Sequence, residues 1–264
     1  MIAETRSEMV RLLRPRLLIG WFALIAMFAI LVNTVMFSMT GGDQPPAGPG
    51  VVFPDDATLA SVEGLVVGLS SAASMFGVVT LSLWALVAAG DYSSGLIRLL
   101  VAAQPHRWKL LSGKLLALSL VTAVATTVGL VVNLGVAPAA AGAAGIDTTV
   151  WRAAISASLV VQAWGNSFLA ALVWGVIGLV LAILLRSSAL AISIGVGWVL
   201  VVESIVTNAF DGALDWLPGT VLTAVAQGGN GTLGYPVALT LALTYVTIGL
   251  TAAFVVGWRR DITD

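Results

Sequence analysis

Long apolar runs, separated by short charged or proline-rich segments, extend along almost the whole chain. A helix that crosses the hydrocarbon core of a bilayer needs about 20 apolar residues. Strands of a membrane barrel would instead alternate with a period of two over about ten residues. The pattern therefore predicts an all-α polytopic membrane protein, built as a single transmembrane domain over residues 1–264. Its expected six transmembrane helices cover residues 17–39, 64–89, 115–136, 153–185, 188–206 and 236–257.

Composition excludes the other broad classes. The chain is 59% hydrophobic and only 9% charged, and its mean hydropathy is +1.02. Soluble domains are about a quarter charged, and disordered chains are poor in apolar residues. A soluble globular enzyme and a disordered chain are thus both excluded. The chain has no cysteine, which removes disulfides and thiolate metal sites from consideration.

The few charges are sorted by side. In the six-helix arrangement, eleven of the twelve Lys and Arg residues fall on one side, and Arg152 alone falls on the other. Cytoplasmic segments carry the excess of Lys and Arg. We therefore expect cytoplasmic N- and C-termini, external loops at 40–63, 137–152 and 207–235, and a cytoplasmic segment at 90–114. The Ala-, Gly- and Val-rich composition favours a bacterial plasma membrane.

Two segments, one before the first predicted span and one before the last, are also distinctive. Residues 1–14 predict an amphipathic helix on the inner membrane interface, the alternative being a disordered basic tail. Ile2, Met9 and Leu13 can share its apolar face, while its charged side chains can point to water: Glu4, Glu8, Arg11 and Arg14. The apolar but broken stretch within 207–235 predicts a re-entrant segment of one or two short helices before the last span. A plain external loop is the alternative.

No catalytic constellation is present. His106 is the only histidine, so one chain can form neither a Ser-His-Asp triad nor a multi-histidine metal site. Gly113-Lys114 is similar to the end of a phosphate-binding loop, but Leu115 stands where that motif needs Ser or Thr. We expect a non-enzymatic subunit that has no cofactor of its own.

Polar groups within the apolar runs are candidates for a substrate path. They are Asn33, Asn133, Gln162, Asn166 and Glu203. Hydrogen bonding between helices is the alternative role of the amides. Gly64-x-x-x-Gly68 and Ala73-x-x-x-Gly77 permit close helix approach. Several tryptophans lie near the predicted interfaces, as in an aromatic belt: Trp21, Trp84, Trp151, Trp216 and Trp258.

The cytoplasmic segment 90–114 is the most distinctive. Asp91 or a nearby serine can cap a short helix that carries Leu96, Ile97, Leu99 and Leu100, and Pro105 marks a turn. Arg107, Lys109 and Lys114 then anchor the start of the next span at the lipid headgroups. A short apolar helix flanked by charge is suited to docking another protein; a simple connecting loop is the alternative.

This segment resembles that of the ABC-2 type permeases, the membrane subunits of ATP-binding-cassette exporters. Their pattern is an acidic residue, an aromatic, Ser-Gly-Thr-Ile-Arg-like residues, a Leu-rich helix, a Pro-x-x-Arg-like turn and a Lys before span three. Leu96 stands where Thr is usual and Asp91 where Glu is usual. The ending, from Trp258 to Ile262, is similar to the family's Phe-x-Arg-Arg-Asp. The matching residues are Asp91, Tyr92, Ser94, Gly95, Ile97, Arg98, Leu99, Leu100, Pro105, Arg107 and Lys114.

The resemblance implies a mechanism. Two permease subunits, as a homodimer or heterodimer, form a path through the lipid bilayer, and separate ATPase subunits that bind ATP and Mg dock beneath it. The cargo would be amphipathic, such as a drug, lipid or peptide, and nucleic acid is not an expected partner. An ion-coupled secondary carrier, in which Glu203 would matter, and a non-transporting membrane scaffold are the alternatives. The implied ATPase-coupling residues are Asp91, Ser94, Gly95, Arg98, Leu99, Leu100, Pro105 and Arg107.

Overall fold

A computed structural model describes residues 2–40, 54–103, 107–154, 156–209 and 215–259 of the chain. Within these ranges the secondary structure is helical and no β-strand occurs, which confirms the all-α prediction. Five helical segments are long and apolar enough to cross a membrane, as expected for a multi-pass membrane protein. They are Pro15–Ser38, Gly64–Ser93, Trp108–Ala143, Ala157–Leu185 and Tyr235–Val256.

The long helices are α2 (Pro15–Ser38), α5 (Ala73–Ser93), α7 (Arg107–Ala143), α9 (Ala157–Leu185) and α13 (Tyr235–Arg259). Helix α4 (Gly64–Ser71) leads directly into α5. The shorter helices are α1 (Ile2–Leu12), α3 (Asp56–Ala60), α6 (Leu96–Ala103), α8 (Thr149–Ala154), α10 (Ser188–Gly197), α11 (Glu203–Ala209) and α12 (Pro218–Gln227), and a π-helix, η1 (Trp198–Val202), joins α10 to α11.

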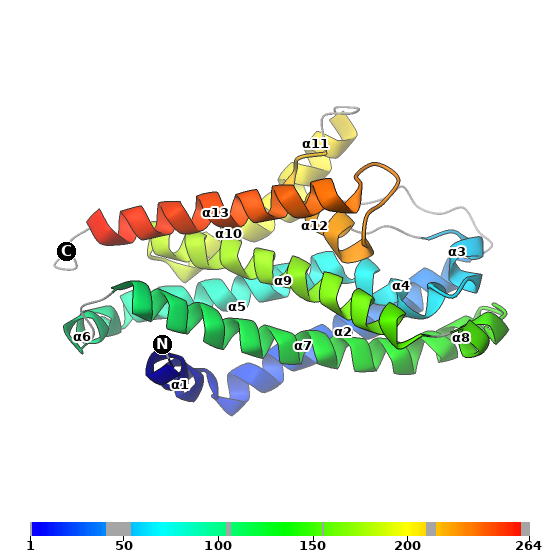
Figure 1. Ribbon diagram of the computed structural model, residues 1–264, viewed down its shortest axis with the longest axis horizontal. Helices are drawn as coiled ribbons and strands as arrows, with labels where there is room; N and C mark the ends of the chain where they lie inside the picture. Colours follow the sequence, from blue (N-terminus) through cyan, green and yellow to red (C-terminus); the bar gives the residue numbers. More distant parts are fainter. Residues whose placement is uncertain (1, 41–53, 104–106, 155, 210–214, 260–264) are drawn as a thin grey trace.

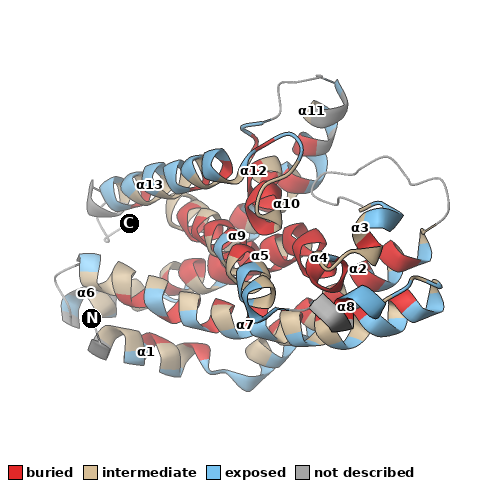
Figure 2. Cartoon of the chain, turned by 45° about the vertical axis from the view of Figure 1, so that its right-hand side comes forward, coloured by how far each residue is buried: buried red, intermediate tan, exposed pale blue. Residues whose placement is uncertain are grey.

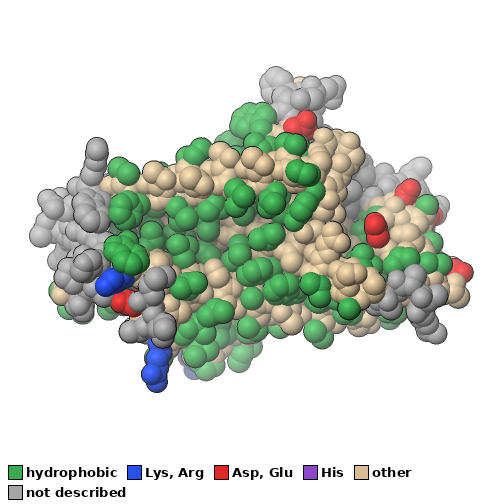
Figure 3. Space-filling view, in the orientation of Figure 1, with side chains coloured by type: hydrophobic (Ala, Val, Ile, Leu, Met, Phe, Trp, Pro, Cys, Tyr) green, Lys and Arg blue, Asp and Glu red, His purple; other side chains and the backbone are tan. Residues whose placement is uncertain are grey.

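The long helices lie side by side, and their ends define two ends of the molecule (Figure 1). Helices α1 and α6 and the last turns of α13 lie at one end, whereas α3 and α8 lie at the other. A band of apolar side chains covers the face between the two ends (Figure 3). On that face the basic side chains lie at the end with α1 and α6, and most of the acidic ones lie toward the opposite end.

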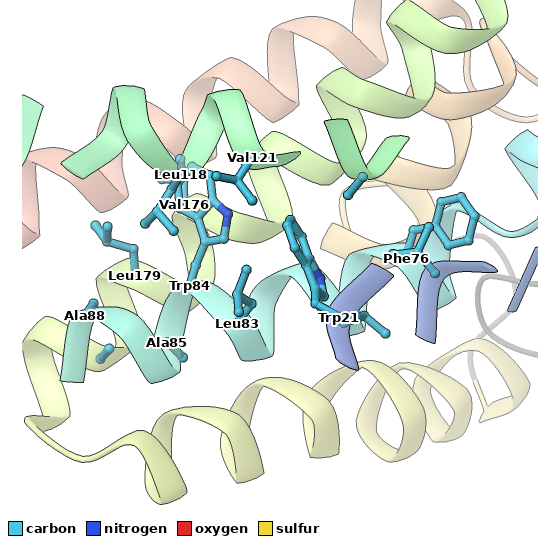
Figure 4. Close-up of a cluster of buried hydrophobic side chains, with 14 of the residues drawn as sticks. Trp21, Phe76, Leu83, Trp84, Ala85, Ala88, Leu118, Val121, Val176 and Leu179 are labelled. Carbon is cyan, nitrogen blue, oxygen red and sulfur yellow. The ribbon is translucent and has the colours of Figure 1, made fainter. Parts of the chain in front are cut away.

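Helices α5 and α9 pack together at the centre of the molecule, where burial is greatest (Figure 2). Trp84 of α5 lies among Leu118, Val121, Val176 and Leu179 in the largest cluster of buried side chains (Figure 4). Two glycines of α9 allow the close approach. A Cβ at Gly175 would lie 2.5 Å from the Trp84 ring, and one at Gly178 would lie 2.2 Å from the carbonyl oxygen of Leu81.

Two glycines of the second apolar run also allow close contacts. A Cβ at Gly77 would lie 2.1 Å from the Trp174 ring, and one at Gly68 would lie 2.2 Å from Oδ1 of Asn33. These contacts confirm the predicted close helix approach in the second apolar run. The aromatic-belt prediction is wrong for Trp21, Trp84 and Trp151, which are buried. Glycine leaves space for an indole ring in the core, and Thr122 accepts the Trp84 N–H at 3.1 Å.

Several helix boundaries depart from the predicted ones. Helix α7 begins at Arg107, before the predicted 115, and the predicted fourth span, 153–185, is divided between the end of α8 and α9. The predicted external loop 137–152 is helical over residues 137–143, because α7 continues to Ala143 with Pro138 inside it. This stretch is rich in alanine, the strongest helix former, and the helix continues past the proline. Residues 188–206, the fifth predicted span, comprise α10, η1 and the first residues of α11, and a π-helical turn interrupts their regular geometry. They are not among the five membrane-length segments, and Ser188–Val202 is a shorter apolar helix.

Candidate functional site

The turn from α5 into α6 depends on Gly95. Ser94 ends α5, with its backbone N–H donating to Gly90 O at 3.1 Å. Gly95 follows with a φ of +68°, and its N–H donates to Tyr92 O at 3.1 Å. No atom lies within 4 Å of a Cβ placed there. The requirement for glycine therefore comes from the left-handed backbone rather than from crowding.

Helix α6 places an apolar side chain in the open. Leu99 is 69% exposed, whereas Leu96, Ile97 and Leu100 are partly buried. Ser94 is exposed as well. Pro105 lies outside the described residues, as do the side chains of Arg98 and Arg107. The described part of the candidate coupling segment is therefore a short helix, packed on α5, that presents Leu99 at the end of the molecule.

Beside α6, four charged side chains from three helices form a closed ring. Glu8 and Arg11 come from α1, Asp91 from the last turn of α5 and Lys114 from α7. Arg11 Nη1 lies 2.7 Å from Glu8 Oε1, and Arg11 Nη2 contacts Asp91 Oδ1. Lys114 Nζ lies 3.0 Å from Glu8 Oε2 and 2.6 Å from Asp91 Oδ2. Each carboxylate oxygen thus faces one cation, and charges alternate around the charge ring (Glu8, Arg11, Asp91 and Lys114).

The charge ring is largely removed from solvent. The side chains of Glu8 and Asp91 are 6% and 5% exposed and that of Lys114 is 11% exposed, while Arg11 reaches solvent at 26%. Removing one member of a buried ion pair costs about 3–5 kcal/mol, because the remaining charge is left uncompensated. The ring therefore fixes α1 to the ends of α5 and α7.

The packing of α1 differs from the sequence-based prediction. Glu8 was expected to point to water, but it is buried against Lys114, because α1 packs on α7 rather than lying free. Leu12, not Leu13, is the buried residue at the end of α1. Gly113 permits this packing, since its Cβ would lie 2.8 Å from Cβ of Glu4. Gly113-Lys114 thus serves helix packing and ion pairing.

A second contact joins the candidate coupling segment to the helix pair α9 and α10. Arg186 ends α9 in a left-handed conformation with a φ of +52°. Its guanidinium lies over the Tyr92 ring, 5.9 Å from the ring centroid. Tyr92 follows directly after Asp91, so neighbouring residues at the end of α5 contact α1, α7 and the turn between α9 and α10.

The structure brings together two of the candidate path residues, Asn33 and Asn133. Asn33 Nδ2 donates to Ala29 O at 2.8 Å and to Asn133 Oδ1 at 2.9 Å, and Asn133 Nδ2 donates to Leu65 O at 2.8 Å. Both amides are completely buried. This pair links α2, α7 and α4, which is the interhelical hydrogen bonding considered as the alternative to a substrate path.

The other three candidates lie apart from this amide pair. Gln162 is exposed on α9. Asn166 is buried and accepts a hydrogen bond from Tyr235 Oη at 2.9 Å. Glu203 is 1% exposed, and its Oε1 accepts from Trp198 Nε1 at 2.8 Å and from the Gly219 N–H at 2.9 Å. Glu203 therefore holds the beginning of α12, while Asn166 lies beside Gly228 at its end.

Searches with the chain find no matching family model and no matching curated protein. The function is therefore inferred from the residues and from their geometry.

Proposed function

We propose that the chain is the permease subunit of an ATP-binding-cassette exporter in a bacterial plasma membrane. Two permease subunits, identical or different, would form the path for an amphipathic drug, lipid or peptide. Separate ATPase subunits would bind ATP and Mg and dock at the end that carries α6. Both termini of the permease would then be cytoplasmic, with α1 at the inner interface.

The observation that carries the proposal is the short helix α6 between two membrane-length helical segments. It is separated from α5 by the turn at Gly95, it exposes Leu99, and its two flanks are joined by the ion pair of Asp91 with Lys114. An apolar side chain exposed on a short helix at the end of the molecule is available to a protein partner. Four residues of the family resemblance, Ile97, Arg98, Leu99 and Leu100, lie in α6, and the others flank it in the sequence.

A sixth span fits the course of the chain. Helices α9 and α13 both run toward the end with α1 and α6 (Figure 1), so the segment between them has to return to the opposite end. Helices α10, η1 and α11 contain 10, 5 and 7 residues. At 1.5 Å per residue these 22 residues extend about 33 Å, which is close to the thickness of the hydrocarbon core.

The six-span topology predicts which single cysteines can be labelled from outside intact cells. The chain has no cysteine of its own, so each variant carries one reactive thiol. Thr149→Cys and Ala209→Cys are expected to react with a membrane-impermeant maleimide, whereas Ser94→Cys reacts only after the cells are permeabilised. Outside labelling at Ser94, or protection at Ala209, would contradict this topology.

Docking of an ATPase predicts a strong effect of charge on α6. We expect the chain to co-purify with a soluble subunit that carries a phosphate-binding loop, encoded next to its own gene. Leu99→Asp is expected to reduce the amount of that subunit recovered by about tenfold or more, because a charge placed in a desolvated contact has to be buried without a partner. Quantitative co-purification from membranes measures this.

Two variants control for folding and for a general effect of charge. Leu99→Met keeps an apolar side chain of similar size, so recovery should match that of the unmodified chain. Val150→Asp places the same carboxylate on an exposed apolar position of α8, at the opposite end of the molecule, and should leave recovery unchanged. An equal loss of the subunit in Val150→Asp would contradict docking at α6, because the loss would then follow from an added carboxylate at either end of the molecule.

The ion-coupled carrier is less well supported. Such a carrier needs an ionisable group that is available to its coupling ion within the membrane. Glu203 is the candidate, but its carboxylate accepts hydrogen bonds from Trp198 and Gly219 and is enclosed by them. This arrangement favours a structural role for Glu203 between η1 and α12.

A further inference from the structure

The charge ring lies at the base of the candidate coupling segment. Asp91 precedes α6 and Lys114 follows it, and their side chains are 2.6 Å apart. The segment between them, residues 92–113, therefore begins and ends at one ion pair. This ion pair joins the end of α5 to α7.

Helix α1 is attached to this same point. Glu8 contributes the anion that faces Lys114, and Arg11 contributes the cation that faces Asp91. The close approach at Gly113 brings the backbone of α1 near Thr5 to within 3.2 Å of a Cβ placed there. The N-terminal helix thus contacts both flanks of α6 through opposite charges and packs directly on the second flank.

We propose that the charge ring is a joint through which α1 moves together with the base of the coupling segment. The inference rests on the proposed function, because it requires an ATPase that displaces α6. In this arrangement Glu8, Arg11 and Lys114 are positioning residues: they act through α6 and α1 and touch no substrate. The ATPase then moves the N-terminal helix as well as the spans that begin and end at the ring.

The alternation of charge provides a test at constant net charge. Exchanging the charges on α1, by Glu8→Arg with Arg11→Glu, keeps the attraction within α1 but sets like charges against Lys114 and Asp91. Exchanging them at the base, by Asp91→Lys with Lys114→Asp, has the same effect. Combining both exchanges restores alternation at all four contacts. Such a cycle isolates the interaction between α1 and the base from the effects of each exchange alone.

The first measurement uses the full chain in lipid nanodiscs, without any partner. Spin labels on Ser7→Cys in α1 and Val131→Cys in α7 report the position of α1, since both sites are exposed. Val131 lies 17 residues beyond Lys114 along α7, which is about 26 Å. Each exchange alone is expected to broaden and shift the distance distribution, and the combined exchange is expected to restore it. Arg6→Glu, at an exposed position of α1, should leave it unchanged.

The second measurement is the rate of ATP hydrolysis by the co-purified ATPase subunit, with and without the permease variant. Each exchange alone is expected to reduce the effect of the permease on that rate by roughly fivefold or more, within the usual range of coupling between sites. The combined exchange is expected to recover it. A change in this rate is the readout that a merely structural contact between α1 and the base would not affect.

The outcomes are distinct. Unchanged distances in the single exchanges, or no recovery in the combined one, would overturn the joint. Altered distances with unaltered ATP hydrolysis would overturn its role in coupling while leaving the proposed function intact. If no ATPase associates with the unmodified chain, the proposed function fails, although the distances still report on the ring. If the exchanged chains do not accumulate, Glu8→Gln with Arg11→Gln removes only the charges of α1, and the same shift in distance is expected.

Discussion

Gly178→Ala is expected to destabilise the protein by about 3 kcal/mol or more, at or beyond the upper end of the usual range for overpacked cores, about 1–3 kcal/mol. A Cβ at this position would lie 2.2 Å from the carbonyl oxygen of Leu81 and 2.9 Å from its Cα. These are backbone atoms in the middle of α5, so no side chain can rotate away to make room. The methyl group can be accommodated only if α5 and α9 move apart.

Separation of α5 and α9 would loosen the packing around Trp84. Its ring lies against Gly175, one helical turn from Gly178, and its N–H donates to Thr122 of α7. We therefore expect Gly178→Ala to lower the midpoint temperature measured by fluorescence-detected size exclusion of heated, detergent-solubilised protein. Loss of a monodisperse peak at every temperature would be the extreme form of the same result.

Gly165→Ala is the matched control, on the same helix. No atom lies within 4 Å of a Cβ placed at Gly165. Alanine in a helix is favoured over glycine by roughly 0.5–1 kcal/mol, so this variant should be as stable as the unmodified chain or slightly more stable. Equal midpoint temperatures for Gly165→Ala and Gly178→Ala would contradict the close packing of α5 on α9.

The apolar runs predicted the long helices well, because a single local property determines them. A run of apolar residues with no charge has to be helical within a bilayer, where the backbone must satisfy its own hydrogen bonds. Helix α2 spans Pro15–Ser38 against a predicted 17–39, and α13 spans Tyr235–Arg259 against 236–257. The length of α7 was underestimated, because residues 137–143 were expected to belong to an external loop but continue the helix through Pro138.

Contacts between distant segments could not be predicted in this way. Asp91 is separated from Arg11 by 80 residues, and Lys114 is separated from Glu8 by 106. The sequence pattern predicts water around Arg11 and Glu8 and lipid headgroups around Lys114, each a reasonable environment for a single charge. Their mutual burial depends on how α1 packs on α7, and that packing depends on the absence of a side chain at Gly113.

The π-helix η1 is a further feature without a sequence signal. It widens one turn of the helical run that begins at Ser188, and Glu203 directly follows it. Such turns frequently occur at functional positions. Here the turn places Trp198 and Glu203, five residues apart, within 2.8 Å of each other through the indole N–H and Oε1. The apolar residues from Trp198 to Val202 are compatible with an ordinary α-helix as well.

Glu203→Leu is expected to release the beginning of α12. The carboxylate is the acceptor for the Trp198 N–H and the Gly219 N–H, and leucine offers neither donor a partner. The Gly219 N–H is buried, and leaving it unpaired costs about 1–3 kcal/mol. Trp198 is 40% exposed, so its N–H adds little, and a loss of about 1–3 kcal/mol is expected. Hydrogen–deuterium exchange should show it as faster exchange in peptides covering residues 218–227.

Glu203→Gln separates the hydrogen bonds from the charge. Its amide oxygen can occupy the position of Oε1 and accept from both donors, so the exchange in α12 should stay slow. A carboxylate also interacts favourably with the N-terminal end of a helix, which predicts a small residual effect in this variant. If Glu203→Gln releases α12 as fully as Glu203→Leu does, the negative charge itself stabilises this contact. If neither variant changes the exchange, packing alone holds the buried helix α12 in place.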